Sequence, residues 1–199
     1  MSPLADEGVD MSGSVLQTKT EDRRVSRTRA ALIAAYNRLI LSRRRNIRVA
    51  DIVAEANVGR STFYEHYQGA EDIHLQALAR PFATLADAAA GNGDVAALTG
   101  LLAHFWENRQ LARDSIMGRM QDKVTRLLAA MIEARIAAAG EPTAIPLKRA
   151  SLQLAEAALA PIRGWVTAEA SCSADALASA ICGAGRALRT NLFVEGPSA

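Results

Sequence analysis

A chain of 199 residues with only two cysteines has no disulfide framework, and it is long enough for one or two domains that each bury a core. Half of its residues are hydrophobic but only 5% are aromatic, and sustained alternation of apolar and polar residues is missing, which excludes a β-sheet protein and predicts an all-α fold. No segment has the apolar length of a membrane span, and residues 1–22 lack the apolar centre of a signal peptide, so we expect a cytoplasmic protein without a membrane partner.

The small net charge of +2 hides an uneven distribution along the chain. Residues 23–60 contain ten arginines and two acids, Asp51 and Glu55, so this segment carries +8 and the rest of the chain carries −6. A basic segment on an otherwise acidic chain is typical of polyanion-binding proteins, and arginine favours bidentate contacts to phosphate and guanine. The alternative is a solvated helix face, which the position of the segment beside the motif below disfavours.

The first part of the chain is predicted to be a leader followed by one helix. Residues 1–22 are low in hydrophobicity and lack periodicity, which predicts a disordered leader. A helix is expected over residues 26–43, with Ser26 or Thr28 as its cap. Its inward-facing stripe is Leu32, Ile33, Tyr36, Leu39 and Ile40.

Residues 51–67, DIVAEANVGRSTFYEHY, predict two short helices joined by a tight turn. Ile52 and Val53 give the first helix an apolar face. Asn57 tolerates a positive φ and therefore suits the end of that helix. Phe63 and Tyr67, four residues apart, are expected to face inward from the second helix. The first turn of that helix is polar and cationic, as suits an element that enters the major groove of DNA.

A fourth helix over residues 71–80 is expected to link this helix-turn-helix head to a helical body. Pro81 is expected to kink or end it. The body helices are expected at residues 82–90, 94–108, 110–139, 146–168 and 173–193. The predicted organisation is therefore a leader at residues 1–22, a DNA-binding domain at 23–80 and an effector-binding and dimerisation domain at 81–199.

Residues 59–67, GRSTFYEHY, resemble the tetracycline-repressor (TetR) family of bacterial transcription regulators, and the resemblance extends over about residues 29–78. It implies a three-helix head that binds DNA and a helical body that binds an effector and forms a homodimer. Three features depart from the family pattern. Asn57 stands where relatives usually have Gly, and Ala70 where they often have a phosphate-binding Lys. The connection before the motif also lacks the usual Gly.

The residue chemistry and this resemblance together assign roles in DNA binding. Arg60 is expected to read guanine and Ser61 a neighbouring base edge, since both suit hydrogen bonds in the major groove. Phosphate contacts are expected from Thr62, Tyr64, His66, Arg43, Arg44, Arg45 and Arg48. For Tyr64 and His66 the alternative is that they bridge helices within the head. Arg24, Arg27 and Arg29 are further candidates for the DNA backbone or an adjacent minor groove.

The body offers candidate residues for a ligand pocket and for a dimer interface. The candidate pocket residues are Phe82, His104, Phe105, Trp106, Arg113, Met117, Met120 and Trp165, with His104 and Arg113 as the polar groups that orient a ligand. The alternative is a plain hydrophobic core. The candidate interface residues are Leu154, Ala158, Ile162, Leu177, Ile181, Gly183, Ala184 and Leu188. Sequence alone leaves an intrachain core equally open, and the resemblance favours the dimer.

Motifs of catalysis are missing from the sequence: it has no GxSxG, P-loop, dinucleotide-binding or HExxH pattern. The cysteines lack metal-ligand spacing, so no metal, cofactor or enzymatic activity is expected. The predicted function is a ligand-responsive repressor that binds a palindromic double-stranded DNA operator as a homodimer and is released by a small apolar effector. The alternative is a DNA-binding regulator controlled by a protein partner, without a small-molecule pocket. A third hypothesis is a helical binding module without affinity for DNA.

Overall fold

The computed structural model describes residues 11–42 and 47–193. Regular structure in these residues is helical, and an isolated antiparallel bridge joins Thr143 to Phe193. The predicted all-α class is therefore confirmed. The chain divides into two compact units, Met1–Ile73 and His74–Ala199, which we call the head and the body. Helix α4 (Ala70–Ala89) spans this division, which lies before the boundary expected after residue 80.

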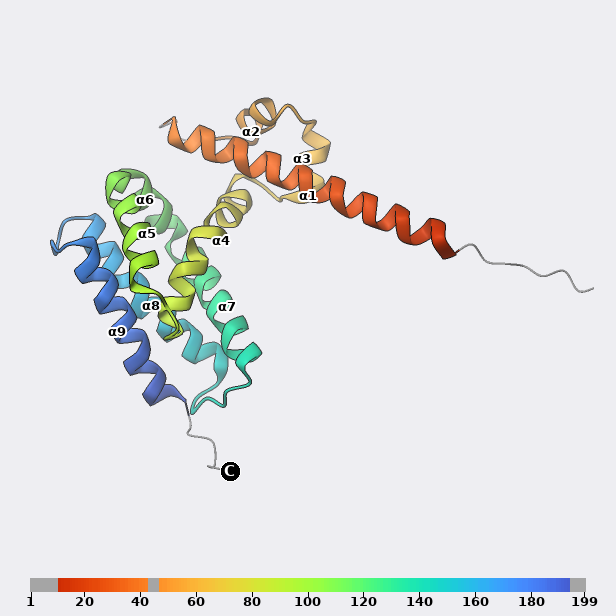
Figure 1. Ribbon diagram of the computed structural model, residues 1–199. Helices are drawn as coiled ribbons and strands as arrows, with labels where there is room; N and C mark the ends of the chain where they lie inside the picture. Colours follow the sequence, from red (N-terminus) through yellow and green to blue (C-terminus); the bar gives the residue numbers. More distant parts are fainter. Residues whose placement is uncertain (1–10, 43–46, 194–199) are drawn as a thin grey trace, which may run out of the picture. The chain divides into compact units, whose positions relative to one another are not determined.

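The head consists of α1 (Met11–Leu41), α2 (Val49–Ala56), α3 (Arg60–His66) and the start of α4. Helices α2 and α3 lie along the second half of α1 (Figure 1). The guanidinium Nε of Arg38 on α1 donates to the Glu55 carboxylate on α2 at 2.7 Å. Among the side chains that the structure describes, those buried in α1, α2 and α3 are Leu32, Ala35, Tyr36, Leu39, Ile52 and Phe63, and Tyr67 directly after α3 is buried as well.

Helix α1 begins earlier than predicted. The sequence predicted a disordered leader through residue 22 and a helix from residue 26, whereas α1 already begins at Met11; residues 1–10 of the predicted leader lie outside the described residues. From residue 14 to Leu41 the chain contains neither Gly nor Pro, so nothing local interrupts the helix. The low hydrophobicity of residues 1–22 predicted that they do not pack against a hydrophobic core. A helix also forms without such packing where its residues have sufficient intrinsic helix propensity.

Helix α4 continues through Pro81, although the sequence predicted a kink or an end there and separate helices at 71–80 and 82–90. Proline removes one backbone hydrogen bond, which disfavours the helix at this point. Burial of Phe82 and Leu85 directly after it favours the continuous helix. Arg135 stabilises the same turns, because it pairs with Asp87 and donates to the Ala83 carbonyl at 3.1 Å.

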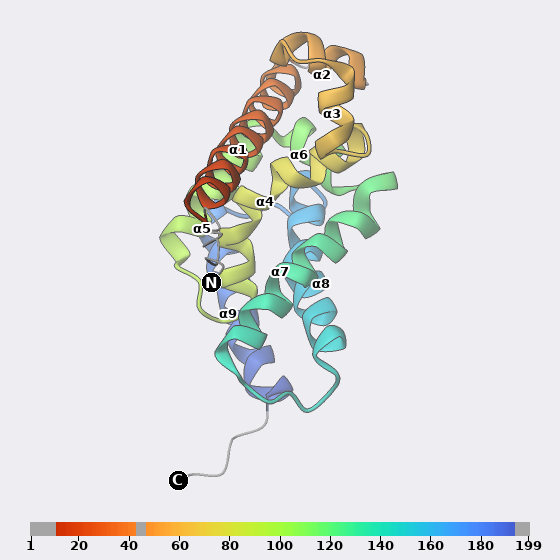
Figure 2. The same ribbon diagram turned by 90° about the vertical axis from the view of Figure 1, so that its right-hand side faces the viewer.

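The body contains α5 (Val95–Glu107), α6 (Arg109–Ile116), α7 (Gln121–Ala139), α8 (Leu147–Val166) and α9 (Ala174–Leu192). Helix α8 packs against α7 and α9, and α9 also packs against α5 (Figure 2). The helix predicted over residues 110–139 is divided into α6, the 3-10 turn Gly118–Met120 and α7. Gly118 has a φ of +60°, a left-handed conformation that interrupts the helix and that glycine adopts at little cost. No helix within the described part of the chain is long and apolar enough to cross a membrane.

Helix α9 approaches the end of α4 so closely that one glycine is required. A Cβ atom at Gly185 would lie 2.3 Å from the Ala88 carbonyl oxygen, which is closer than real Cβ contacts allow. Four residues later, Arg189 donates to the Ala90 carbonyl at 2.9 Å and pairs with Glu141. Backbone contact and arginine hydrogen bonds therefore fasten α9 to the C-terminal end of α4.

Candidate nucleic-acid interface

The turn between α2 and α3 has the geometry that its sequence predicted. Asn57 has φ 53° and ψ 49°, so it ends α2 in the left-handed conformation. The Val58 amide donates to the Val53 carbonyl at 3.1 Å, and the Asn57 amide donates to the Ala54 carbonyl at 3.3 Å. These bonds satisfy the last carbonyls of α2 and fix the angle at which the chain enters α3. The prediction that Asn57 ends the first motif helix is confirmed.

The start of α2 is held by a carboxylate. The Asp51 side chain accepts from the Arg48 backbone amide at 2.9 Å and also lies 3.7 Å from the Arg48 Nε. The Asp51 carboxylate thereby satisfies the backbone amide directly before α2. The Arg48 side chain nevertheless remains 76% exposed, so it is accessible to a ligand of the head.

One side of α3 is buried in the head, as predicted. Phe63 is fully buried and Tyr67 is 4% exposed, and their ring centroids lie 5.6 Å apart. Burial raises the pKa of Tyr67 most strongly, with a further increase from Asp72 and a decrease from the nearby Arg29. The buried pair fixes the rotation of α3 about its own axis.

The other side of α3 is polar and accessible. Arg60, Ser61 and Tyr64 are exposed, whereas Thr62 and His66 are half-buried. The Tyr64 ring meets Phe63 edge-on at 5.4 Å but is 53% exposed, so its hydroxyl is available to solvent. The structure thus brings five of the predicted DNA-binding residues together on one short helix. Arg43, Arg44 and Arg45 lie outside the described residues.

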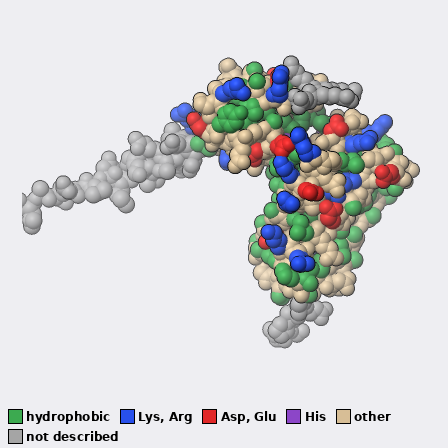
Figure 3. Space-filling view, turned by 180° about the vertical axis from the view of Figure 1, so that it is seen from behind, with side chains coloured by type: hydrophobic (Ala, Val, Ile, Leu, Met, Phe, Trp, Pro, Cys, Tyr) green, Lys and Arg blue, Asp and Glu red, His purple; other side chains and the backbone are tan. Residues whose placement is uncertain are grey.

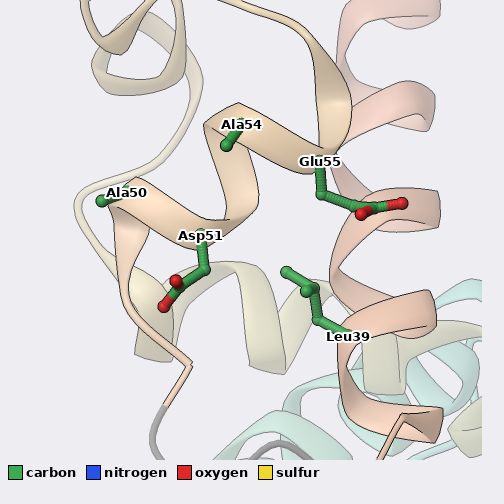
Figure 4. Close-up of a pocket in the computed structure, with 5 residues that line it drawn as sticks. All are labelled: Leu39, Ala50, Asp51, Ala54 and Glu55. Atoms are coloured by element: carbon green, nitrogen blue, oxygen red, sulfur yellow. The ribbon is translucent and has the colours of Figure 1, made fainter.

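A groove of about 510 Å³ lies between α1 and α2 (Figure 4). Its lining residues are Leu39, Ala50, Asp51, Ala54 and Glu55. Both of its carboxylates interact with arginines, since Glu55 pairs with Arg38 and Asp51 with Arg48. The exposed side of α3, which carries Arg60 and Ser61 with side chains open to a ligand, is the better candidate for a DNA contact.

The candidate pocket residues separate into two groups. Phe82, Phe105, Met120 and Trp165 are buried and Met117 is half-buried, while His104, Trp106 and Arg113 are exposed. His104 and Arg113 therefore lie at the surface of the body, outside its buried interior, and their role in orienting a ligand stays a prediction. Helices α5 and α6 each bury a single stripe, Leu98, Leu102 and Phe105 on α5 and Ala112, Ser115 and Ile116 on α6. His104 and Arg113 fall between these positions.

Trp106 and Trp165 form an aromatic pair at the surface of the body. Their ring centroids are 4.8 Å apart, and the Arg109 guanidinium lies 5.4 Å from the Trp106 ring. The Trp165 indole donates to the Cys172 carbonyl at 2.9 Å, which holds it in the interior. Trp106 remains 36% exposed, so this pair joins the core to the surface.

Most of the predicted dimer residues lie in the core of a single chain. Leu154, Ala158, Ile162, Leu177 and Ile181 are at most 5% exposed, which favours the alternative of an intrachain core for these five residues. Gly183, Ala184 and Leu188 are half-buried and therefore partly accessible. Both the core and the outer face of a packed helix repeat at three-to-four spacing, so the pattern itself did not distinguish them.

A polar network between α7 and α8 escaped the sequence analysis. Arg163, 9% exposed, donates to the Glu156 carboxylate and to the Thr125 hydroxyl, each at 2.8 Å. The Thr125 hydroxyl in turn donates to Glu156 at 2.8 Å. Burial disfavours the charged form of Glu156, but the hydrogen bonds and the charge of Arg163 outweigh it and lower the carboxyl pKa. The available signal was an acid and an arginine seven residues apart, on one face of α8.

Metal ligation has no candidate within residues 11–42 and 47–193, where no group of three or more His, Cys, Asp or Glu side chains could hold an ion.

Comparison with known proteins gives one curated relative and several solved structures. The chain is 33% identical over 82 residues to an uncharacterized HTH-type transcriptional regulator, YxbF, of Bacillus subtilis, a match that covers 40% of this chain and 22% of that protein. No family model matches the chain.

The solved structures are more distant in sequence. A TetR transcriptional regulator from Streptococcus agalactiae is 22% identical, with a TM-score of 0.46, over 83% of this chain and 97% of that one. A putative TetR-family regulator from Mesorhizobium loti is 14% identical, with a TM-score of 0.45, over 86% and 99% of the two chains. RolR, solved in complex with resorcinol, is 19% identical, with a TM-score of 0.43, over 87% and 98%. This chain is an all-helical protein whose helix-turn-helix head resembles the TetR family of transcription regulators, as residues 59–67 predicted.

Proposed function

We propose that this protein is a DNA-binding transcription regulator that places α3 in the major groove. The observation that carries the proposal is the two-sidedness of α3: Phe63 and Tyr67 anchor one side in the head, while Arg60, Ser61 and Tyr64 are exposed on the other. A short helix held rigidly by its apolar side presents its polar side chains in a defined register to a duplex. A regulator of this kind acts at the chromosome, so the proposal includes a cytoplasmic location.

Within this proposal, Arg60 reads a guanine and Ser61 an adjacent base edge. Tyr64, Thr62 and His66 contact phosphate oxygens, which fixes the position of α3 without reading sequence. Arg48 adds a phosphate contact from the start of α2, and the proposal assigns the same role to Arg43, Arg44 and Arg45.

The direct test is the selection of an operator from a random duplex library, followed by binding measurements with single variants. Arg60→Ala is expected to weaken operator binding by about 10- to 100-fold and to relax the preference at one base pair of each half-site, because one bidentate contact is lost. Arg126→Ala, which removes an exposed arginine of α7, is the matched control and leaves binding unchanged. Equal weakening by Arg60→Ala on every sequence contradicts the base-reading role.

The proposal includes a homodimer that binds a palindromic operator. Helix α9 has an accessible face of small residues, and at Gly183 an added Cβ atom would meet nothing within 4 Å in its own chain. Small residues on an accessible face allow a second helix to approach closely. Two heads related by a two-fold axis require half-sites about 34–36 Å apart or a multiple of that spacing.

Gly183→Glu tests this interface. Because the space beside Gly183 is open in a single chain, the variant is expected to keep its helical content while its mass in analytical ultracentrifugation falls to that of a monomer. Operator affinity then falls as well, since a monomer contacts one half-site. A variant that remains dimeric places the interface elsewhere.

Regulation is proposed to act through a small apolar effector bound in the body, which releases the operator. Buried Phe105, Met120 and Trp165 give the body interior large apolar side chains, and an effector must bind the released state more tightly to shift the equilibrium. A panel of small aromatic compounds is therefore expected to include one that quenches tryptophan fluorescence, raises the melting temperature and lowers operator affinity in parallel.

The second candidate is a regulator controlled by a protein partner. The exposure of Trp106, with Arg109 beside its ring, favours it, because tryptophan and arginine dominate the binding energy of many protein interfaces. Under this candidate Trp106→Ser abolishes regulation in cells without changing operator affinity in vitro. Under the first candidate, regulation persists in this variant.

A further inference from the structure

Arg163, in the last turn of α8, is a buried arginine with one donor left over. Its Nη1 donates to the Glu156 carboxylate on the same helix, and its Nη2 donates to the Thr125 hydroxyl on α7, which lies beside α8 (Figure 2). The Nε is buried as well, and among the described residues it has no hydrogen-bond partner. Buried polar groups are nearly always hydrogen-bonded, so this donor requires an acceptor that the described part of the chain does not supply.

A second arginine of the body, Arg135 on α7, has no donor left over. Its Nε donates to the Asp87 carboxylate, its Nη1 to the Met131 carbonyl and its Nη2 to the Ala83 carbonyl. Figure 3 shows further Lys and Arg side chains next to Asp and Glu side chains on the surface of the body. Paired charges are therefore common on this molecule, and the unmatched Nε is what distinguishes Arg163.

The pair of Arg163 and Glu156 is open to solvent from the side of the carboxylate. The side chain of Glu156 is 49% exposed, whereas that of Arg163 is only 10% exposed. The carboxylate can therefore turn into water while the guanidinium stays in place. A buried arginine left without a counter-charge is strongly unfavourable, so Glu156 leaves Arg163 only in exchange for another anion.

The donors around Glu156 match a carboxylate. One oxygen of Glu156 accepts from Arg163 and the other accepts from the Thr125 hydroxyl, each at 2.8 Å. An incoming carboxylate finds the same two donors and the unmatched Nε in addition. The residues four before and four after Glu156 on α8 are Leu152 and Ala160, so an apolar group attached to that carboxylate lies against apolar side chains.

From these observations we infer that the effector of the body is an apolar molecule with a carboxylate group, and that this carboxylate replaces Glu156 on Arg163 and Thr125. This assignment rests on the proposed function and specifies the effector class and its binding site. Glu156 is then a competitor built into the chain, which neutralises Arg163 in the ligand-free protein and moves into solvent when the ligand binds. Because one carboxylate replaces another, the charge balance around Arg163 is preserved.

The alternative is that Glu156 and Arg163 only join neighbouring turns of the bundle. The two roles differ in what they predict for Glu156→Gln. A neutral amide binds Arg163 less strongly than a carboxylate does, so under the competitor role this variant gains affinity for an external carboxylate. A purely structural ion pair gives no reason for such a gain, and neither does a loss of folding.

The test is calorimetric titration of the full chain with benzoate, 3-phenylpropanoate and hexanoate, with the amides of the same three acids, and with inorganic phosphate. The variants are Glu156→Gln and Arg163→Gln. Asp87→Asn is the matched control, because Asp87 is 50% exposed and also pairs with an arginine of the body, Arg135. Operator affinity is measured in parallel with and without each compound.

At least one of the carboxylates is expected to bind the wild type and to lower its operator affinity. Its affinity rises about 10-fold in Glu156→Gln, because charge-assisted hydrogen bonds are roughly twice as strong as neutral ones. Its affinity falls about 10- to 100-fold in Arg163→Gln, and the corresponding amide binds the wild type more weakly by a similar factor. Asp87→Asn binds the carboxylate as the wild type does.

The inference is overturned if no carboxylate binds the wild type or Glu156→Gln at millimolar concentrations, or if acid and amide bind equally. An equal gain in Asp87→Asn overturns it too, and phosphate binding as tight as the carboxylates overturns the ligand class. Binding through Arg163 that leaves operator affinity unchanged overturns the effector role. In each case operator selection by the wild type leaves the proposed DNA binding intact. Failure to select any operator refutes the proposed function itself, and the titrations then decide only whether Arg163 binds carboxylates.

Discussion

Replacing Phe63 with alanine tests whether the head owes its stability to the residue that orients α3. Phe63 is fully buried, and truncation of such a side chain costs about 3–5 kcal/mol through lost burial and the cavity left behind. The head of 73 residues has a total unfolding free energy of roughly 4–11 kcal/mol, at 0.05–0.15 kcal/mol per residue. Phe63→Ala is therefore expected to remove a large part of this free energy and to weaken operator binding, while the body stays folded.

Hydrogen exchange followed by mass spectrometry measures the stability of the head and of the body separately. Peptides from the described head are expected to lose protection in Phe63→Ala, while peptides from α7, α8 and α9 keep it. Phe82→Ala is the matched control, because Phe82 is equally buried but belongs to the core of the body. Equal loss of protection in both units after Phe63→Ala refutes the separate stability of the head, and a change below about 1 kcal/mol refutes the cavity argument.

Three further predictions concern single side chains. Asn57→Ala is expected to lower the unfolding free energy of the head by about 1 kcal/mol, measured by thermal unfolding, because residue 57 has a φ of 53°. Asn57→Gly is expected to leave this free energy unchanged. Equal destabilisation by the two substitutions would contradict the role of the left-handed conformation. Gly185→Ala is expected to destabilise the body by about 1–3 kcal/mol through overpacking, whereas Gly100→Ala, with open space around it, is expected to be neutral or stabilising in denaturant unfolding. The pKa of Glu156 is lowered in the folded chain, so its contribution to stability is present above its ordinary value of 4.5 and is lost as pH falls. The difference in unfolding free energy between wild type and Glu156→Gln should therefore shrink from about pH 5 towards pH 3, and a constant difference would exclude this linkage.

The local structure of the head was predictable because neighbouring residues in the chain determine it. The left-handed Asn57, the inward direction of Phe63 and Tyr67 and the exposed side chains of Arg60 and Ser61 follow from turn chemistry and helix periodicity. The two-sidedness of α3 and the residue after it, on which the proposed function depends, is a property of eight consecutive residues, 60–67. The resemblance of residues 59–67 to a known family rests on the same local pattern.

What a side chain in the body contacts was decided by the tertiary structure. Periodicity gives a helix two or more candidate faces but not the partner of each, so Leu154 and Ile181 were assigned to an interface and His104 to a pocket. Pro81 lies within α4 because burial of Phe82 and contacts from α7 outweigh a local preference against helix. The hydrogen bond from Arg163 to Thr125, and the contact of Gly185 with α4, join positions far apart in the chain. The helix and turn propensities of each segment follow from its local sequence. Burial and ion pairing depend on which segments come into contact in the tertiary structure.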